Sequence, residues 1–307
     1  MITRIFSKSK PINFVIVVSI IILLFVVVHY ELLQSEITFP LILQLLLKLL
    51  IVVFSVFVLD FIVSKNNLTQ RNSYAIMSLA LLLALFPSGL LHQDVIIANV
   101  FVLLAFRRLI SLQSKLYIQK KLFDAAFWIA LASLLYPWAI LFFVVIMVAV
   151  VYYSQNDIKN ILVPFSGVIT VFIILVAYNI IKYDTYFTAD TFSFQISTDF
   201  SVYNNMASII ALTMMLVISV WTMLYFIRVL RDRPKKMKPV YAILAWWFLV
   251  AFIIALIAPV KNQSEFILLM APLSIIIANY LEVITERWFK EGIVILLALT
   301  PIAMLLL

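Results

Sequence analysis

Cysteine is absent from this chain of 307 residues, which also contains only 3 glycines and 2 histidines. Without cysteine, the protein can form no disulfide bond, no thiolate metal site and no iron–sulfur cluster. Charged residues are scarce as well, at 12% of the sequence, whereas hydrophobic residues make up 66%. A soluble domain needs more polar surface than this composition supplies. The composition therefore predicts a polytopic membrane protein.

Long apolar runs follow one another along the whole chain, and most have the length of about 20 residues that an α-helix needs to cross a bilayer. The pattern predicts an all-α transmembrane helical bundle of about eleven spans. We place these spans at residues 12–29, 40–63, 73–91, 94–112, 122–136, 138–153, 161–181, 206–227, 239–260, 266–281 and 292–307. The short pair between 122 and 153 forms either two full spans or a re-entrant hairpin.

The positions of lysine and arginine predict the orientation, because basic flanks are retained on the cytoplasmic side of a membrane. With the N-terminus inside, 19 of the 22 basic residues fall in cytoplasmic segments. The segments 107–124 and 228–238 are the most basic, and we expect them to contact anionic lipid headgroups. The net charge of +8 is thus a signal of topology. Binding to nucleic acid would need a soluble basic face, which the sequence does not offer.

Lys48 is the most informative single residue, because it lies eight residues into an expected span, about 12 Å deep. A cation at the centre of such a helix costs roughly 2.5–3.5 kcal/mol on insertion scales. Gln44, Lys48 and Ser55 share one face of the helix, which predicts a polar stripe toward the interior of the bundle. Either an anionic ligand or an external acid then satisfies the ammonium, or the side chain extends to the interface without a protein partner.

Acidic residues and both histidines gather at the expected outer ends of the spans. Glu31 and Glu36 lie in the first external loop, and His29, His92 and Asp94 lie at neighbouring span ends. Carboxylates and imidazoles at one mouth suit a general base or a divalent cation. We expect these residues, with Lys48 and Gln44, to form one outward-facing ligand pocket. In the alternative interpretation they are ordinary interfacial residues, and Asp94 only stabilises the start of a helix.

Another helix start is indicated farther along the chain. Asn262 is followed three residues later by Glu265, a spacing that is typical of a capping box at a helix N-terminus. We therefore expect a new span to begin close to these two residues.

Residues 107–181 carry a family resemblance. A basic segment leads into two tight spans divided by Pro137, and a polar turn then precedes a long span that ends in Tyr-Asn. This segment resembles the middle of the seven-span module of the GT-C glycosyltransferases. The whole chain also resembles an uncharacterised bacterial family of polytopic inner-membrane proteins. The resemblance implies a seven-span module at 1–181, an external loop at 182–205 and a four-span bundle at 206–307, within one membrane domain.

The GT-C resemblance also implies an activity. In that superfamily the catalytic acid lies in the first external loop, so Glu31 or Glu36 would deprotonate the acceptor of a sugar carried on polyprenyl phosphate. Lys48 would then stabilise the departing phosphate. The implied location is a bacterial inner membrane, with the N-terminus inside and the C-terminus outside.

Two other classes of function stay open. The chain could be a non-catalytic subunit of a cell-envelope assembly, with its aromatic external loop as a contact surface. A transporter is disfavoured, because transporters commonly contain repeats with paired glycine or proline breaks and this chain has so few glycines.

Overall fold

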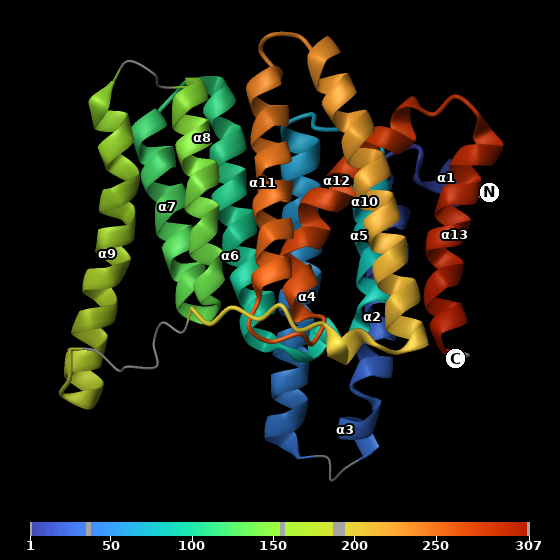
Figure 1. Cartoon of the computed structure of the whole chain (residues 1–307), viewed down its shortest axis with the longest axis horizontal. Helices are drawn as coiled ribbons and strands as arrows, with labels where there is room; N and C mark the ends of the chain where they lie inside the picture. The colour runs from blue at the N-terminus through green and yellow to red at the C-terminus, as the bar shows by residue number, and fades with distance from the viewer. Residues whose placement is uncertain (1, 35–37, 154–156, 187–193, 306–307) are drawn as a thin grey trace. The chain divides into compact units, whose positions relative to one another are not determined.

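The computed structural model describes residues 2–34, 38–153, 157–186 and 194–305 of the chain. Within these ranges every regular element is a helix, which confirms the all-α prediction (Figure 1). The longer helices are α2 (Pro11–Val28), α4 (Phe39–Lys65), α5 (Tyr74–Leu85), α6 (Gln93–Ile110), α7 (Ile118–Leu135), α8 (Phe143–Tyr153), α9 (Ile158–Tyr183), α10 (Met206–Asp232), α11 (Lys238–Ile257), α12 (Ile267–Val283) and α13 (Arg287–Leu305). The shorter elements are α1 (Ile2–Phe6), α3 (Tyr30–Gln34), η1 (Pro87–Leu91), η2 (Ser111–Ser114), η3 (Pro137–Phe142), η5 (Ser201–Tyr203) and η6 (Ser264–Phe266).

Among the described residues, seven helical segments are long and apolar enough to cross a membrane. They are Pro11–Val28, Phe39–Lys65, Gln93–Ser114, Ile158–Tyr183, Met206–Asp232, Lys238–Ile257 and Ser264–Val283. These helices support a polytopic membrane protein. The expected span 73–91 is divided, since Pro87 opens η1 after α5, whereas Pro137 opens η3 between the expected spans 122–136 and 138–153. Proline lacks the N–H that would continue the preceding α-helix.

The helices form two compact units, and neither unit is continuous in the sequence. Unit 1 contains residues 1–96, 199–232 and 260–307, and unit 2 contains residues 97–198 and 233–259. In unit 1, α12 packs against α5 and α10, and α10 also packs against α13. Residues 267–281 of α12 are all buried, as expected for a helix that is apolar on every side.

The N-terminal segment of unit 1 is attached to α13 by one buried carboxylate. Glu291 Oε1 accepts hydrogen bonds from the backbone N–H of Thr3 at 3.1 Å and from the Thr3 hydroxyl at 2.5 Å. Its Oε2 accepts the N–H of Ile2 at 3.1 Å. The free N–H groups at the start of α1 therefore find their acceptor at the other end of the chain.

The turn between α6 and α7 in unit 2 lies within the basic segment 107–124 that we expect to contact anionic lipid headgroups. Lys115 and Tyr117 have left-handed φ angles of 56° and 53°, so the segment bends instead of continuing as a helix. Arg108 and Asp124 form an ion pair of 2.9 Å across the bend. Lys121 Nζ donates to the carbonyl of Ser111 at 2.6 Å. Two of the basic residues of this segment are thus bonded within the protein.

Helices α7 and α9 of unit 2 lie side by side and approach each other closely at Gly167 (Figure 1). A Cβ atom at this position would lie 2.8 Å from the carbonyl oxygen of Phe123 and 3.0 Å from Cβ of Ala126. Small residues permit such close approach of membrane helices, where packing is the main source of stability. Gly167 therefore determines how closely α9 approaches α7.

We expect Gly167→Val to separate these two helices and to lower the melting temperature of the detergent-solubilised protein. Backbone atoms of Phe123 and Phe127 would have to move, and such overpacking typically costs about 1–3 kcal/mol. Gly292→Ala is the matched control, because a Cβ at Gly292 meets no atom within 4 Å. Equal melting temperatures for Gly167→Val and the wild type would contradict this interpretation.

Candidate functional site

Polar side chains gather in unit 1 where the C-terminal end of α2, the helix α4, the turn from η1 to α6, and η6 come together. The elements η1 and η6 pack against each other, and η1 also packs against α2. We call this group the polar cluster, and its members are His29, Lys48, His92, Tyr203, Lys261, Asn262, Gln263 and Glu265.

Glu265 is fully buried, with an exposed fraction of 0%. Its Oε1 accepts the hydroxyl of Tyr203, and its Oε2 accepts the backbone N–H of Asn262 at 3.2 Å. The Asn262 side-chain oxygen accepts the backbone N–H of Ser264 at 3.2 Å. Glu265 therefore makes one of the two bonds of the expected capping box, while the Asn262 side chain accepts from Ser264 and not from Glu265.

The surroundings of Glu265 combine a tyrosine and a lysine. Burial raises the pKa of Tyr203, and the neighbouring Glu265 carboxylate raises it further. Lys261 is buried with its ammonium 4.6 Å from the ring centroid of Phe200. Burial lowers the pKa of Lys261, and Glu265 acts in the opposite direction. Tyr203 therefore keeps its proton and donates a hydrogen bond to the carboxylate throughout the physiological pH range, while Lys261 provides a nearby positive charge.

A tight contact between η1 and η6 positions His92. The backbone N–H of Ser88 donates to the side-chain oxygen of Gln263 at 3.0 Å, and a Cβ at Gly89 would lie only 3.0 Å from the Gln263 carbonyl oxygen. At the end of η1, His92 Nδ1 lies 3.4 Å from the side-chain nitrogen of Asn262. The imidazole is therefore linked through Asn262 to the buried carboxylate.

Lys48 points into the protein. Its exposed fraction is 7%, and its Nζ donates to the carbonyl oxygen of Leu91 at 3.0 Å. The ammonium interacts electrostatically with both His29 and His92. Across the described ranges, no ion pair between Lys48 and a carboxylate is recorded. Three basic side chains thus lie together at one end of the helices.

His29 contributes a free ring nitrogen to this group. The residue is fully buried, its ring stacks on Phe25 at 4.1 Å, and its Nδ1 lies 2.9 Å from the Phe25 carbonyl oxygen. An Nδ1 that faces a carbonyl carries the proton, which leaves Nε2 as an acceptor. Nε2 is buried and has no hydrogen-bond partner in the part of the chain that the structure describes. A buried acceptor of this kind is generally hydrogen-bonded, so a water molecule or a ligand can donate a hydrogen bond to it.

Of the residues predicted for a ligand pocket, the structure brings together His29, Lys48 and His92. Asp94 is exposed in the first turn of α6 and interacts electrostatically with His92. Gln44 is exposed, so it does not continue the buried face of α4 that carries Lys48 and Ser55.

Only one of the two predicted acids lies in a described part of the chain. Glu31 is exposed on α3, two residues after the buried His29. Glu36 lies outside the described residues. Among the described residues, no three His, Asp or Glu side chains lie together in a way that could hold a metal ion.

Sequence reasoning missed the buried acid and two of its neighbours. Glu265 was expected only as a helix cap, and Tyr203 and Lys261 were not assigned to the pocket. Tyr203 and Glu265 are 62 positions apart, so no local spacing reveals their contact. Lys261 did offer a signal, because it is one of the few basic residues on the side expected to be outside.

Removing the Tyr203 hydroxyl leaves one oxygen of a buried carboxylate without its donor. We expect Tyr203→Phe to destabilise the protein by about 1–3 kcal/mol, because an unsatisfied buried acceptor is costly. The measurement is the melting temperature in detergent. Tyr186→Phe is the control, since Tyr186 is 72% exposed. An equal melting temperature for the two variants would show that the bond contributes little.

The pKa of His92 predicts how stability depends on pH. Burial lowers this pKa, the charge of Lys48 lowers it further, and Asp94 partly opposes both effects. The unfolded chain therefore binds a proton more readily than the folded protein, and stability falls as the pH drops below about 6.5. We expect the melting temperature to decrease from pH 7 to pH 5, and His92→Gln to reduce this decrease. An unchanged pH dependence in His92→Gln would assign the effect to other groups.

Comparison with known proteins identifies the family of the chain, and the function of that family is unknown. A family of unknown function, DUF6427, has a family model that matches residues 1–306, so the chain belongs to this family. No curated protein matches the chain, and no solved structure matches it.

Proposed function

We propose that this protein is a polytopic inner-membrane protein that acts at its outer face on a sugar linked to polyprenyl phosphate, as a GT-C-like glycosyltransferase. In this proposal the bundle has about eleven spans and lies in a bacterial inner membrane, with the N-terminus inside and the C-terminus outside. The seven-span module at 1–181 and the four-span bundle at 206–307 remain part of the proposal.

The observation that carries the proposal is the placement of Lys48. An ammonium has three N–H donors, and the recorded hydrogen bond to Leu91 uses one of them. The remaining donors can bind oxygens of a phosphate, which is the group that the departing polyprenyl carrier presents. His92 and the unpartnered Nε2 of His29 lie within electrostatic range of the same ammonium. The ammonium suits a phosphate group, and the imidazoles can hydrogen-bond to the hydroxyl groups of the attached sugar.

A general base is assigned to the first external loop. Glu31 is exposed and follows His29 by two residues, so it lies at the same end of α2 as the basic groups. Glu36 belongs to the same loop. In the proposed reaction one of these carboxylates takes a proton from the acceptor hydroxyl, which attacks the sugar as the bond to the phosphate breaks. Lys48 stabilises the charge that develops on the phosphate.

Substitution of Lys48 tests this assignment directly. We expect Lys48→Leu to abolish sugar transfer, because it removes the cation that stabilises the leaving group, and we expect Lys48→Arg to retain part of it. The measurement is the transfer of labelled sugar to envelope glycans in cells that produce each variant at equal levels in the membrane. Glu31→Gln and Glu36→Gln should lower transfer in the same assay. Full transfer by folded Lys48→Leu protein would rule out the proposed role.

A second function, a non-catalytic subunit of a cell-envelope assembly, is favoured by exposed apolar side chains in the segment after α9. Ile196 and Val202 are 64% and 62% exposed, and both lie within the mostly polar segment that joins α9 to α10. Exposed apolar side chains outside the membrane-spanning helices suit contact with another protein. Co-purification of a stoichiometric partner in mild detergent, with no effect of Glu31→Gln or Lys48→Leu on envelope glycans, would favour this second function.

A further inference from the structure

An apolar groove runs along unit 1 between α10 and α13. Its volume is about 780 Å³. Ile209, Val217 and Ile218 line it from α10, and Ile293 and Leu296 line it from α13. Since α10 is one of the helices that can cross a membrane, the walls of this groove lie at the depth of lipid acyl chains.

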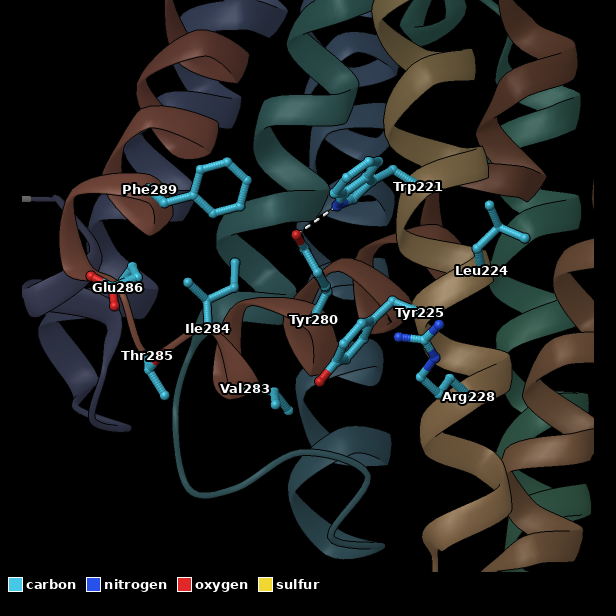
Figure 2. A pocket seen from close by; sticks show the side chains of 10 residues that line it. All are labelled: Trp221, Leu224, Tyr225, Arg228, Tyr280, Val283, Ile284, Thr285, Glu286 and Phe289. Carbon is cyan, nitrogen blue, oxygen red and sulfur yellow. Dashed lines mark hydrogen bonds between the residues drawn. The ribbon is translucent and has the colours of Figure 1, made fainter.

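The groove continues into a smaller and more polar pocket at the C-terminal end of α10. This pocket has a volume of about 370 Å³ and shares Trp221, Tyr280 and Phe289 with the groove. Where the two spaces meet, the indole of Trp221 donates to the Tyr280 hydroxyl at 2.5 Å. Figure 2 shows this bond as a dashed line.

The polar pocket presents opposite charges on opposite sides. Figure 2 shows Arg228 of α10 on one side and Glu286, which precedes α13, on the other. An arginine is well suited to bind a phosphate through two N–H groups. A carboxylate across the same pocket repels a second negative charge and attracts an ammonium. The pair therefore complements a headgroup that carries both a phosphate and an amine.

The length of the groove matches one lipid chain. Ile209 and Trp221 are twelve residues apart on α10, which corresponds to about 18 Å of helix. One leaflet of a bilayer contributes about half of the 30 Å hydrocarbon thickness. A single acyl chain that starts at the level of Trp221 would therefore extend along most of the groove.

We propose that this groove is a binding site for one glycerophospholipid with an amine headgroup. The phosphate binds Arg228, the amine lies beside Glu286, and one acyl chain fills the space between α10 and α13. This site is separate from the polar cluster, and it does not depend on the proposed transferase activity. It differs from general contact with anionic lipids, because it requires both a defined chain groove and a pair of charges.

Gly292 offers a precise way to block the groove. It lines the groove, and a Cβ at this position would meet no atom within 4 Å. Gly292→Phe should therefore place an aromatic ring in the space of the acyl chain. Gly292→Ala is the matched control, because one methyl group leaves most of the groove open. Both changes also replace glycine inside a helix, which favours folding.

The experiment is native mass spectrometry of the full-length protein in mild detergent, with added palmitoyl-oleoyl phosphatidylethanolamine. We expect one retained lipid for wild type and for Gly292→Ala, and an affinity for this lipid on the order of tenfold lower for Gly292→Phe and for Arg228→Gln. Glu286→Gln should raise binding of phosphatidylglycerol relative to phosphatidylethanolamine. Wild-type retention of lipid by Gly292→Phe, or equal losses in Gly292→Phe and Gly292→Ala, would overturn the proposal.

A second measurement needs no variant. A phosphatidylethanolamine with a photoreactive group midway along one acyl chain is incubated with the wild-type protein and illuminated. The proposal expects the labelled peptides to come from residues 209–221 and 288–300. Labelling spread evenly over the lipid-facing surfaces of α4 and α9, with no enrichment at the groove, would show only general contact with the bilayer.

Discussion

The hydrogen bonds of the buried Glu265 carboxylate hold together the turns at one end of unit 1. It binds the Tyr203 hydroxyl and the Asn262 backbone, and Tyr203 in turn accepts the backbone N–H of Gln263 at 2.8 Å. Removing any one of these groups would leave another buried polar atom unsatisfied, which is more costly than the bond itself is favourable. The start of α12 is therefore held by a closed set of mutually dependent bonds.

The other turns of unit 1 are attached by the same kind of interaction. Glu291 receives the first N–H groups of α1, and Glu282 receives the backbone N–H of Gln70 at 2.7 Å. In each case a glutamate near a helix end accepts donors from a segment more than 200 residues away. A bilayer gives little hydrophobic drive for helices to associate, so hydrogen bonds between their ends carry much of the specificity.

The helices could be predicted from the sequence, because each apolar run needs to satisfy its own backbone in a membrane. The polar cluster could be predicted only in part. Lys48 and His92 were found because a charge or an imidazole within an apolar run is conspicuous. Glu265 and Tyr203 were not, since their partnership depends on how distant turns pack. Gln44 was misplaced because helical spacing alone does not say how wide the buried face of α4 is.

Helix α12 connects the two regions that bear on function. Its first turn follows Glu265 in the polar cluster, and Tyr280, near its end, lies at the mouth of the apolar groove. Because residues 267–281 are buried on all sides, this helix cannot shift at one end without repacking against α5 and α10. The spacing between cluster and groove is therefore fixed by packing, and a ligand at either end meets a preformed surface. A preformed surface loses less conformational entropy when a ligand binds. Burying the apolar helix α12 between the polar cluster and the groove therefore favours binding at both places.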